Sequence, residues 1–187
     1  GTNTLDRIVA LGGNDALIGG AGNDFLDGGT GNDVYLFNPG FGVDLIQDID
    51  STPGNIDTIR FGSGINPADI NVNSFFGGDI LLQVNGTADA IRIEGWQNSD
   101  ASKIERVEFA DGTVWDTAEL ASRIAIAAPT EFDDLLVGTA RNDSVAGLGG
   151  NDAIFGLGGN DVLDGGIGDD FVSGGDGLDV LTGDAGV

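Results

Sequence analysis

A nine-residue unit recurs along this chain, and it restricts the possible fold more than any other feature. Residues 19–27 read GGAGNDFLD and residues 28–36 read GGTGNDVYL, so eighteen residues contain six glycines, with an aspartate at the same place in each half. Glycine loses more conformational freedom on folding than any other residue. A chain that repeats it in register therefore needs backbone conformations that other residues do not readily adopt.

The unit occurs in two blocks. The first block runs through residues 1–36 as four units, and the second follows Pro129 with five gapless units over residues 138–182 and a partial unit before them. Beyond Leu36 the register slips, although GFGVDLI at 40–46 and GNIDTI at 54–59 keep part of the pattern. Chance does not produce aspartates that are spaced by nine in this way.

Each unit reads G-G-x-G-x-D-x-U-x, where U is aliphatic, and this pattern predicts a tight turn followed by a short strand. Glycine fits turn positions where φ is positive or where backbones crowd. In the three-residue strand only U points inward, because strand side chains alternate. The inward row, which we expect to form the core with Tyr35 as its one polar exception, is Ile8, Leu17, Leu26, Tyr35, Val145, Ile154, Leu163, Val172 and Leu181. The fold class predicted is all-β, with two parallel β-rolls.

Two units close one coil of eighteen residues, so unit n lies over unit n+2 and their aspartates face each other. Stacked strands are ~4.8 Å apart, and at an effective dielectric constant of about 20 two carboxylates ~5 Å apart repel by about 3 kcal/mol. A divalent cation between them reverses the sign. Calcium suits such a site because it takes 6–8 oxygen ligands, whereas magnesium keeps its waters and zinc prefers the nitrogen or sulfur ligands of His and Cys, which this chain lacks.

Composition excludes several function classes. The formal net charge is −24, which argues against nucleic acid and anionic membranes as partners, since both need clustered Lys and Arg. No stretch reaches the ~18 apolar residues of a membrane helix, so we expect no membrane insertion. The lack of Cys and His removes disulfides, thiolate sites and the commonest general base. The acids alternate with Leu, Val and Ile, unlike those of a disordered acidic tail.

Both blocks resemble the RTX (haemolysin-type calcium-binding) family, whose nonapeptides form a calcium-binding parallel β-roll. The resemblance implies Ca²⁺ ions, several per chain, between the turns of units n and n+2, held by two aspartates and by turn carbonyls. The implied pairs are Asp6 with Asp24, Asp15 with Asp33, Asp134 with Asp152, Asp143 with Asp161, Asp152 with Asp170, and Asp161 with Asp179. The implied turn glycines are Gly13, Gly20, Gly22, Gly29, Gly31, Gly150, Gly159, Gly166, Gly168, Gly175 and Gly177.

Some positions depart from the motif. Asp44 is expected to cap the first block above Asp24 as a further ligand, and Asp57 is a weaker candidate. The carboxylates from Asp48 onward hint at an EF-hand loop, but its sixth position is Pro53 rather than glycine, so that reading fails. Some units carry another residue in place of a motif glycine, and their turns are weaker candidates for calcium binding. These residues are Leu11, Leu148, Leu157, Thr2 and Thr139 at position two, and Thr4 and Arg141 at position four.

The insert between the blocks contains no nonapeptides. Alternating apolar residues predict strands at 70–72, 80–84, 90–96 and 104–109, and Asp111-Gly112 predicts a hairpin turn. Asp116 followed by Glu119 predicts a helix start, with the helix running through Ile126. Trp96 and Trp115 are expected in the core rather than on a ligand-binding shelf. The insert resembles the haemolysin-type calcium-binding related domain, which implies a scaffold or cap. The predicted division is 1–59, 60–128 and 129–187.

The function predicted is a calcium-binding β-roll module of a secreted, extracellular bacterial protein. The resemblance implies type I export, folding on extracellular calcium and a structural or adhesive role; the alternative is a stabilising module of an exoenzyme or toxin whose catalytic part lies outside this segment. Catalysis within the segment is not expected, because recurrent carboxylates repel phosphate and no G-x-S-x-G serine is present. A glycosidase-type carboxylate pair stays open.

The outward side chains predict a partner surface. Phe155 and Phe171 lie on neighbouring strands and predict an apolar strip for self-association or for a cell-surface or matrix partner; the alternative is that another part of the chain covers them. Ice binding is a further alternative function, since position five carries a row of asparagines: Asn14, Asn23, Asn32, Asn142, Asn151 and Asn160. Position three has no matching threonine rank, and we expect the asparagines to stabilise the turns because Asn tolerates the left-handed conformation.

Overall fold

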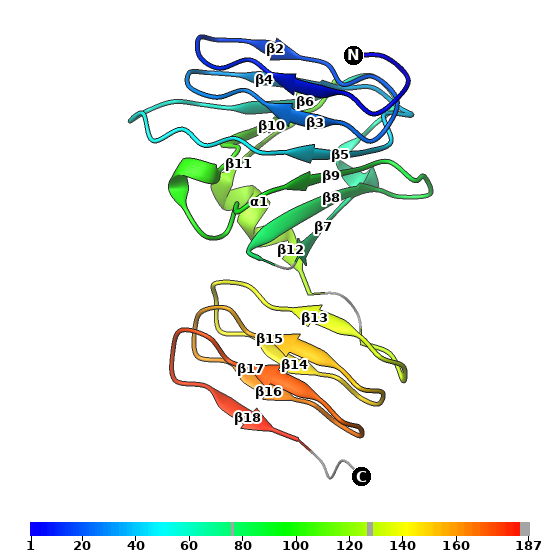
Figure 1. Ribbon diagram of the computed structural model, residues 1–187, viewed down its shortest axis with the longest axis vertical. Helices are drawn as coiled ribbons and strands as arrows, with labels where there is room; N and C mark the ends of the chain where they lie inside the picture. Colours follow the sequence, from blue (N-terminus) through cyan, green and yellow to red (C-terminus); the bar gives the residue numbers. More distant parts are fainter. Residues whose placement is uncertain (76, 127–128, 184–187) are drawn as a thin grey trace. The chain divides into compact units, whose positions relative to one another are not determined.

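The computed structural model describes residues 1–75, 77–126 and 129–183. The chain divides into two compact units, the first built from Gly1–Asn73 and Gly77–Ile124, the second mainly from the chain after Ile124. The predicted C-terminal block extends to 187, and its last four residues lie outside the described ranges. Within those ranges we find no helix with the length and apolar character of a membrane span. The all-β class with parallel strands and one α-helix is confirmed (Figure 1).

The first unit contains two sheets that stack the coils of the first block. The seven-stranded sheet has the order β1 (Arg7–Val9), β3 (Phe25–Asp27), β5 (Val43–Ile46), β9 (Ala90–Ile93), β8 (Asp79–Val84), β7 (Ile70–Phe75), β12 (Ile124–Ala125). The five-stranded sheet has the order β11 (Val114–Asp116), β10 (Arg106–Glu108), β6 (Thr58–Phe61), β4 (Val34–Phe37), β2 (Ala16–Leu17). Odd-numbered and even-numbered repeat strands thus lie in different sheets, as a two-strand coil requires.

The strand register follows the eighteen-residue coil and then departs from it. Ile8 lies opposite Leu26 and Leu17 opposite Tyr35, both parallel and eighteen residues apart. The next coil is longer, since Leu26 pairs with Ile46 and Tyr35 with Ile59, which are 20 and 24 residues apart. The position-eight side chains nevertheless stay inside. The loss of the nonapeptide pattern after Leu36 therefore lengthens the turns without ending the roll.

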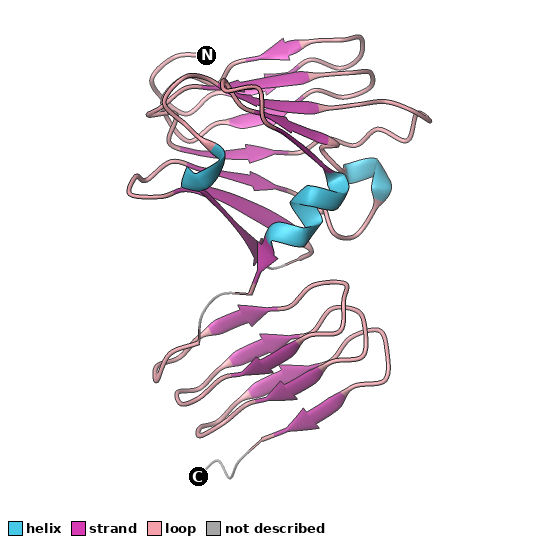
Figure 2. Cartoon of the chain, turned by 180° about the vertical axis from the view of Figure 1, so that it is seen from behind, coloured by secondary structure: helices cyan, strands magenta, loops and turns pink. Residues whose placement is uncertain are grey.

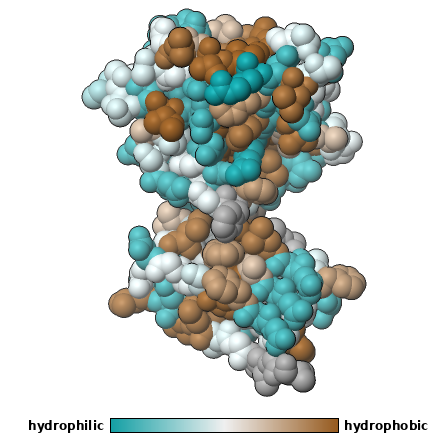
Figure 3. All heavy atoms as spheres, in the orientation of Figure 1, coloured by the Kyte–Doolittle hydropathy of each residue, from teal (hydrophilic) through white to brown (hydrophobic). Residues whose placement is uncertain are grey.

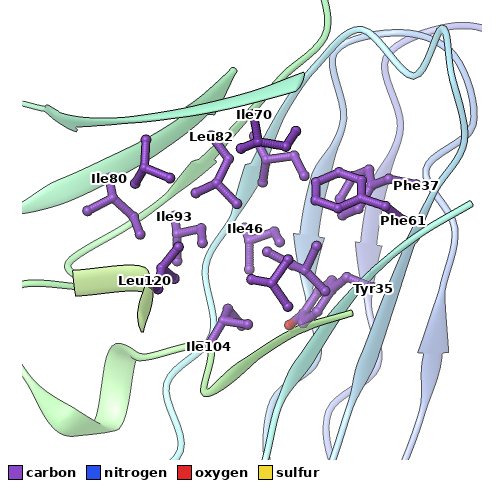
Figure 4. Packing of buried hydrophobic residues seen from close by; sticks show 14 of the residues in the cluster. Tyr35, Phe37, Ile46, Phe61, Ile70, Ile80, Leu82, Ile93, Ile104 and Leu120 are labelled. Carbon is purple, nitrogen blue, oxygen red and sulfur yellow. The ribbon is translucent and has the colours of Figure 1, made fainter. Parts of the chain in front are cut away.

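The insert continues both sheets of the first block. Strand β9 adds to β5 in parallel, and β10 adds to β6 in parallel, so one hydrophobic core extends from Leu17 to Leu120 (Figure 4). The first compact unit runs across the boundary predicted at 59–60. We propose this boundary only as the point where the sequence pattern changes. Trp96 and Trp115 are buried, which confirms the core assignment for both.

The local signals in the insert have the predicted form. Strands β10 and β11 are antiparallel and join through a turn in which Gly112 has a φ of 89°. The Asp116 carboxylate accepts a hydrogen bond from the Glu119 N–H at 2.8 Å and so caps helix α1 (Thr117–Arg123). The helix is shorter than predicted because residues 124–125 join the sheet as β12. Two short 3₁₀ helices span Pro67–Asp69 and Asp100–Ser102.

The second unit is a regular roll (Figure 2). One parallel sheet holds β13 (Leu135–Val137), β15 (Ala153–Phe155) and β17 (Phe171–Ser173), and the other holds β14 (Ser144–Ala146), β16 (Val162–Asp164) and β18 (Val180–Thr182). Its core is a cluster of the buried residues Leu136, Val145, Ile154 and Leu163, with Val172 and Ile126 packed against them. Leu181 was predicted inside but is 49% exposed, because it lies on the edge strand β18.

Candidate metal centre

The aspartates of the repeats form ladders along the turns. In each ladder the backbone N–H of one aspartate donates a hydrogen bond to Oδ1 of the aspartate one coil later. The structure brings together all six predicted pairs in this way: Asp6 with Asp24 (2.7 Å), Asp15 with Asp33 (2.7 Å), and Asp134 with Asp152, Asp143 with Asp161, Asp152 with Asp170 and Asp161 with Asp179 (2.9 Å each). The eighteen-residue coil therefore places the carboxylates as the spacing predicts.

The ladders of the first unit continue past the nonapeptides. Asp24 N–H donates to Asp44 Oδ1 at 2.7 Å, so Asp44 lies above Asp24 as expected. Asp33 N–H donates to Asp57 Oδ1 at 2.8 Å, which gives the weaker candidate an equivalent position. Asp57 N–H in turn donates to Glu105 Oε2 at 2.8 Å. Glu105 was missed, although it precedes strand β10 as the aspartates precede the repeat strands.

The second carboxylate oxygen of the interior ladder residues has no partner. Oδ2 is buried without a hydrogen bond in Asp15, Asp24, Asp33, Asp44, Asp152 and Asp161. A buried carboxylate oxygen without a partner is costly, and burial raises the pKa of Asp44 to about 7 and that of Asp57 to about 6. The charged form is therefore disfavoured unless a cation offsets it. A row of oxygen donors of this kind fits calcium.

The first glycine of the unit leaves room for this oxygen. A Cβ at Gly19 would lie 2.4 Å from Asp24 Oδ2, and one at Gly156 would lie 2.2 Å from Asp161 Oδ2. No real Cβ approaches so closely, so position one must be small wherever the aspartate of the same unit turns inward. Position one was absent from the predicted site residues. It could have been found from the motif, because it is glycine in most units of both blocks.

The predicted turn glycines at positions two and four all have positive φ. The values are 121° (Gly13), 101° (Gly20), 137° (Gly22), 87° (Gly29), 121° (Gly31), 115° (Gly150), 110° (Gly159), 87° (Gly166), 148° (Gly168), 96° (Gly175) and 141° (Gly177). Space is also limited there, since a Cβ at Gly168 would lie 1.8 Å from the Gly150 carbonyl oxygen. These glycines let successive turns stack closely enough for carboxylates and carbonyls to converge.

Leucine at position two preserves the turn. Leu11, Leu148 and Leu157 have φ values of 77°, 76° and 75°, the left-handed conformation that glycine has at this position in other units. For a residue with a Cβ this costs about 1–2 kcal/mol. Their carbonyls stay in the stack, since Leu148 O accepts a hydrogen bond from Ile167 N at 3.0 Å. The three leucines at position two therefore strain their turns and leave the shape of these turns unchanged, whereas Thr2 and Thr139 do not have the positive φ of this position.

The asparagines at position five hold one turn to the next. Asn142 Oδ1 accepts a hydrogen bond from Asn160 N–H at 2.8 Å, and Asn14 Oδ1 accepts one from Asn32 N–H at 3.0 Å. The expectation that they stabilise the turn agrees with these bonds, but the left-handed reason given for it was wrong. Among the described residues, the only non-glycine residues with positive φ are the three leucines.

Comparison with known proteins identifies two family models along the chain. The model described as "RTX calcium-binding nonapeptide repeat (4 copies)" matches residues 1–35, 130–163 and 156–187. The model described as "Haemolysin-type calcium binding protein related domain" matches residues 79–119. The chain is also 35% identical over 87 residues to the iron-regulated protein FrpA of Neisseria meningitidis serogroup C. That match covers 45% of this chain and only 8% of the relative.

Proposed function

Because this chain belongs to the family of RTX calcium-binding nonapeptide repeats, we propose that it is a module whose fold is completed by calcium bound at the aspartate ladders. Calcium binding at multiple repeats is what these families share. The proposal concerns the residues: each cation lies between two turns of one ladder, with one aspartate from each turn and with carbonyls of the positive-φ turn positions as further ligands. We call these the paired-turn sites.

The buried, unpaired Oδ2 atoms of the ladder carry this proposal. Asp24, Asp152 and Asp161 are each at most 2% exposed, and each uses Oδ1 for the backbone of the neighbouring turn. Their second oxygen therefore has no hydrogen-bond donor to offset burial. A cation supplies what the polypeptide does not, and it also removes the repulsion between successive carboxylates.

Binding should be coupled to folding. The chain carries a net charge of −24, which keeps an ion-free chain expanded, and several sites that exist only in the folded state each add RT ln(1 + [L]/Kd) to stability. Circular dichroism should show loss of the β signal of the repeat strands in chelator and a steep recovery with millimolar calcium. Equal magnesium should not restore it. A spectrum that does not change on chelation would contradict the proposal.

The same coupling supports a place outside the cell for the parent protein. RTX repeats are typical of secreted bacterial proteins, and we propose type I export of the unfolded chain followed by folding in extracellular calcium. The chain matches only 8% of the relative's length, which supports a module within a larger protein. Its role there is structural or adhesive; the second candidate is a stabilising module of an exoenzyme or toxin, with any catalytic part outside this segment.

These two roles can be separated experimentally. A structural or adhesive module should itself associate with copies of the chain or with a cell surface once calcium is present. A stabilising module should remain monomeric and instead raise the thermal stability of the parent's other domains. Sedimentation velocity of the folded chain, compared with melting of the parent protein with and without this segment, distinguishes the two.

A further inference from the structure

One aspartate outside the nonapeptides lies inside the first unit. Asp48 follows strand β5 and is 2% exposed. Continuing the register in which Leu26 lies opposite Ile46, Asp48 lies opposite Gly28, the first glycine of its unit. An acidic side chain thus stands at the position that is glycine in most units, where the repeat leaves room for the ladder carboxylate.

Asp48 meets two residues of one ladder. Asp33, Asp48 and Asp57, all buried, each offer a carboxylate oxygen, and these three oxygens lie within 4.8 Å of one another. Three points with such separations share a centre no farther than about 2.8 Å from each (4.8 Å divided by √3). This upper bound accommodates the 2.3–2.6 Å of calcium–oxygen bonds.

Two oxygens of this cluster have no partner. Asp33 Oδ2 and Asp48 Oδ1 are buried and accept no hydrogen bond. The remaining oxygens of these two residues are engaged, because Asp33 Oδ1 accepts from Asp15 N–H at 2.7 Å and Asp48 Oδ2 accepts from the Tyr35 hydroxyl at 2.6 Å. The two unpaired atoms therefore remain available to a cation.

Tyr35 is the sole tyrosine of the chain, and it orients Asp48. It occupies the inward position that is aliphatic in the other units, and Figure 4 shows it within the apolar cluster near Ile46. Its hydroxyl accepts a hydrogen bond from Gly28 N–H at 2.8 Å while donating to Asp48. Burial raises the pKa of Tyr35 above its ordinary value, so the phenol keeps the proton that it donates. The polar exception in the core row is thereby explained.

We propose that Asp33, Asp48 and Asp57 form an interior calcium site, held in place by Tyr35, that differs from the paired-turn sites by its third carboxylate at position one. The paired-turn sites take two aspartates at position six of units n and n+2. Here the longer turn between β5 and β6 adds a carboxylate from within the roll. The proposal rests on the proposed function for Asp33 and Asp57, and on the structure alone for Asp48.

Terbium provides a direct test, because it replaces calcium and emits when a nearby aromatic ring transfers energy to it, an effect that falls steeply with distance. In the full 187-residue chain, excitation of tyrosine should give terbium emission that calcium suppresses by competition. Excitation at the red edge, where only Trp96 and Trp115 absorb, provides the internal reference. Tyr35→Phe should lose the tyrosine-excited emission and, because Asp48 loses the hydroxyl that holds it, should bind that calcium equivalent more weakly in equilibrium dialysis.

Asp48→Asn tests the third ligand. It should lose one calcium equivalent in dialysis together with the tyrosine-excited emission. Asp164→Asn, the same change of charge on β16 of the second unit, should retain both. Unchanged stoichiometry and emission in Asp48→Asn would overturn the interior site alone, whereas a wild-type chain that binds no calcium would overturn the proposed function as well. If Asp48→Asn does not fold, the absence of tyrosine-excited emission in wild type still overturns the inference.

Discussion

The two units use the same repeat but bury very different amounts of apolar surface. The second unit keeps the eighteen-residue register throughout, yet the buried cluster at its core has four members: Leu136, Val145, Ile154 and Leu163. The first unit loses the register after Leu36, and its core nevertheless includes stacked aromatic rings from the insert, with Phe61 on Phe109 at 5.3 Å and Phe109 on Trp115 at 4.7 Å. From this comparison we expect the regular roll to depend on its proposed cations more than the irregular one, which has a larger core.

Removing calcium should therefore affect the two units unequally, and this is the largest effect that we expect. In chelator the amides of β13–β18 should exchange completely, because apolar burial alone does not offset the repulsion of two aspartate ladders. The amides of β8 and β9 should stay protected, since these strands belong to the insert and not to the ladders. Hydrogen exchange followed by mass spectrometry measures both. Equal loss of protection in the two units would break the comparison.

Within the second unit, the interior aspartates should matter more than those at the edge. Asp161 accepts from Asp143 N–H and donates its own N–H to Asp179, so it belongs to two proposed paired-turn sites, whereas Asp179 belongs to one among the described residues. Either substitution leaves one backbone donor unpaired, the Asp143 N–H or the Asp161 N–H, at a cost on the order of 1–3 kcal/mol, so the difference between the variants reports the number of sites. Calorimetric calcium stoichiometry should fall more for Asp161→Ala than for Asp179→Ala. Equal losses would mean that the pairing of units n and n+2 is wrong.

A pair of glycines tests whether the space beside the carboxylate is required. A Cβ at Gly156 would lie 2.2 Å from Asp161 Oδ2 and 2.4 Å from the Gly174 carbonyl oxygen, whereas one at Gly158 meets nothing closer than 3.8 Å. Gly156→Ala should therefore raise the calcium concentration at the folding midpoint, with an overpacking cost of about 1–3 kcal/mol. Gly158→Ala is the matched control and should fold at nearly the wild-type calcium concentration. If both variants shift alike, steric room at position one is not what the motif preserves.

The regular parts of this structure could be predicted from the sequence, because one short period fixes strand, turn and stacking together. Asp134 and Asp152 had to meet once two units closed a coil. The continuation of the roll by the insert could not be predicted, since the pairing of β5 with β9 joins residues 47 apart, such as Val43 and Ala90. Asp48 matched only an EF-hand pattern that fails at Pro53, and its place opposite Gly28 depends on a turn whose length the repeat does not set.

Relief of backbone strain is a smaller effect, and it can be compared across the two units. Leu11 and Leu148 share a left-handed conformation, but Leu11 is 76% exposed and Leu148 only 45%. Replacement of either leucine by glycine removes a strain of about 1–2 kcal/mol. The replacement of Leu148 also removes more buried apolar surface than that of Leu11. Leu11→Gly should therefore stabilise its unit more than Leu148→Gly does, in melts at saturating calcium. A loss of stability in both variants would show that the leucine side chains outweigh the strain.

The smallest expected effect on stability concerns the apolar strip of the second unit. Phe171 is 59% exposed, and its ring lies 5.5 Å from that of Phe155; apolar side chains remain on the surface of both units (Figure 3).

Phe171→Ser should lower calcium-dependent self-association in sedimentation velocity, because it removes the larger part of a contiguous apolar contact. The free energy of unfolding at saturating calcium should change by no more than about 0.5 kcal/mol, as is usual for exposed positions. Val114→Ser, which removes an apolar side chain that is 44% exposed on the first unit, serves as the control and should leave association unchanged. If the wild-type chain stays monomeric with calcium, or if the two variants associate equally, the strip is not a surface for self-association and the stabilising-module role gains support.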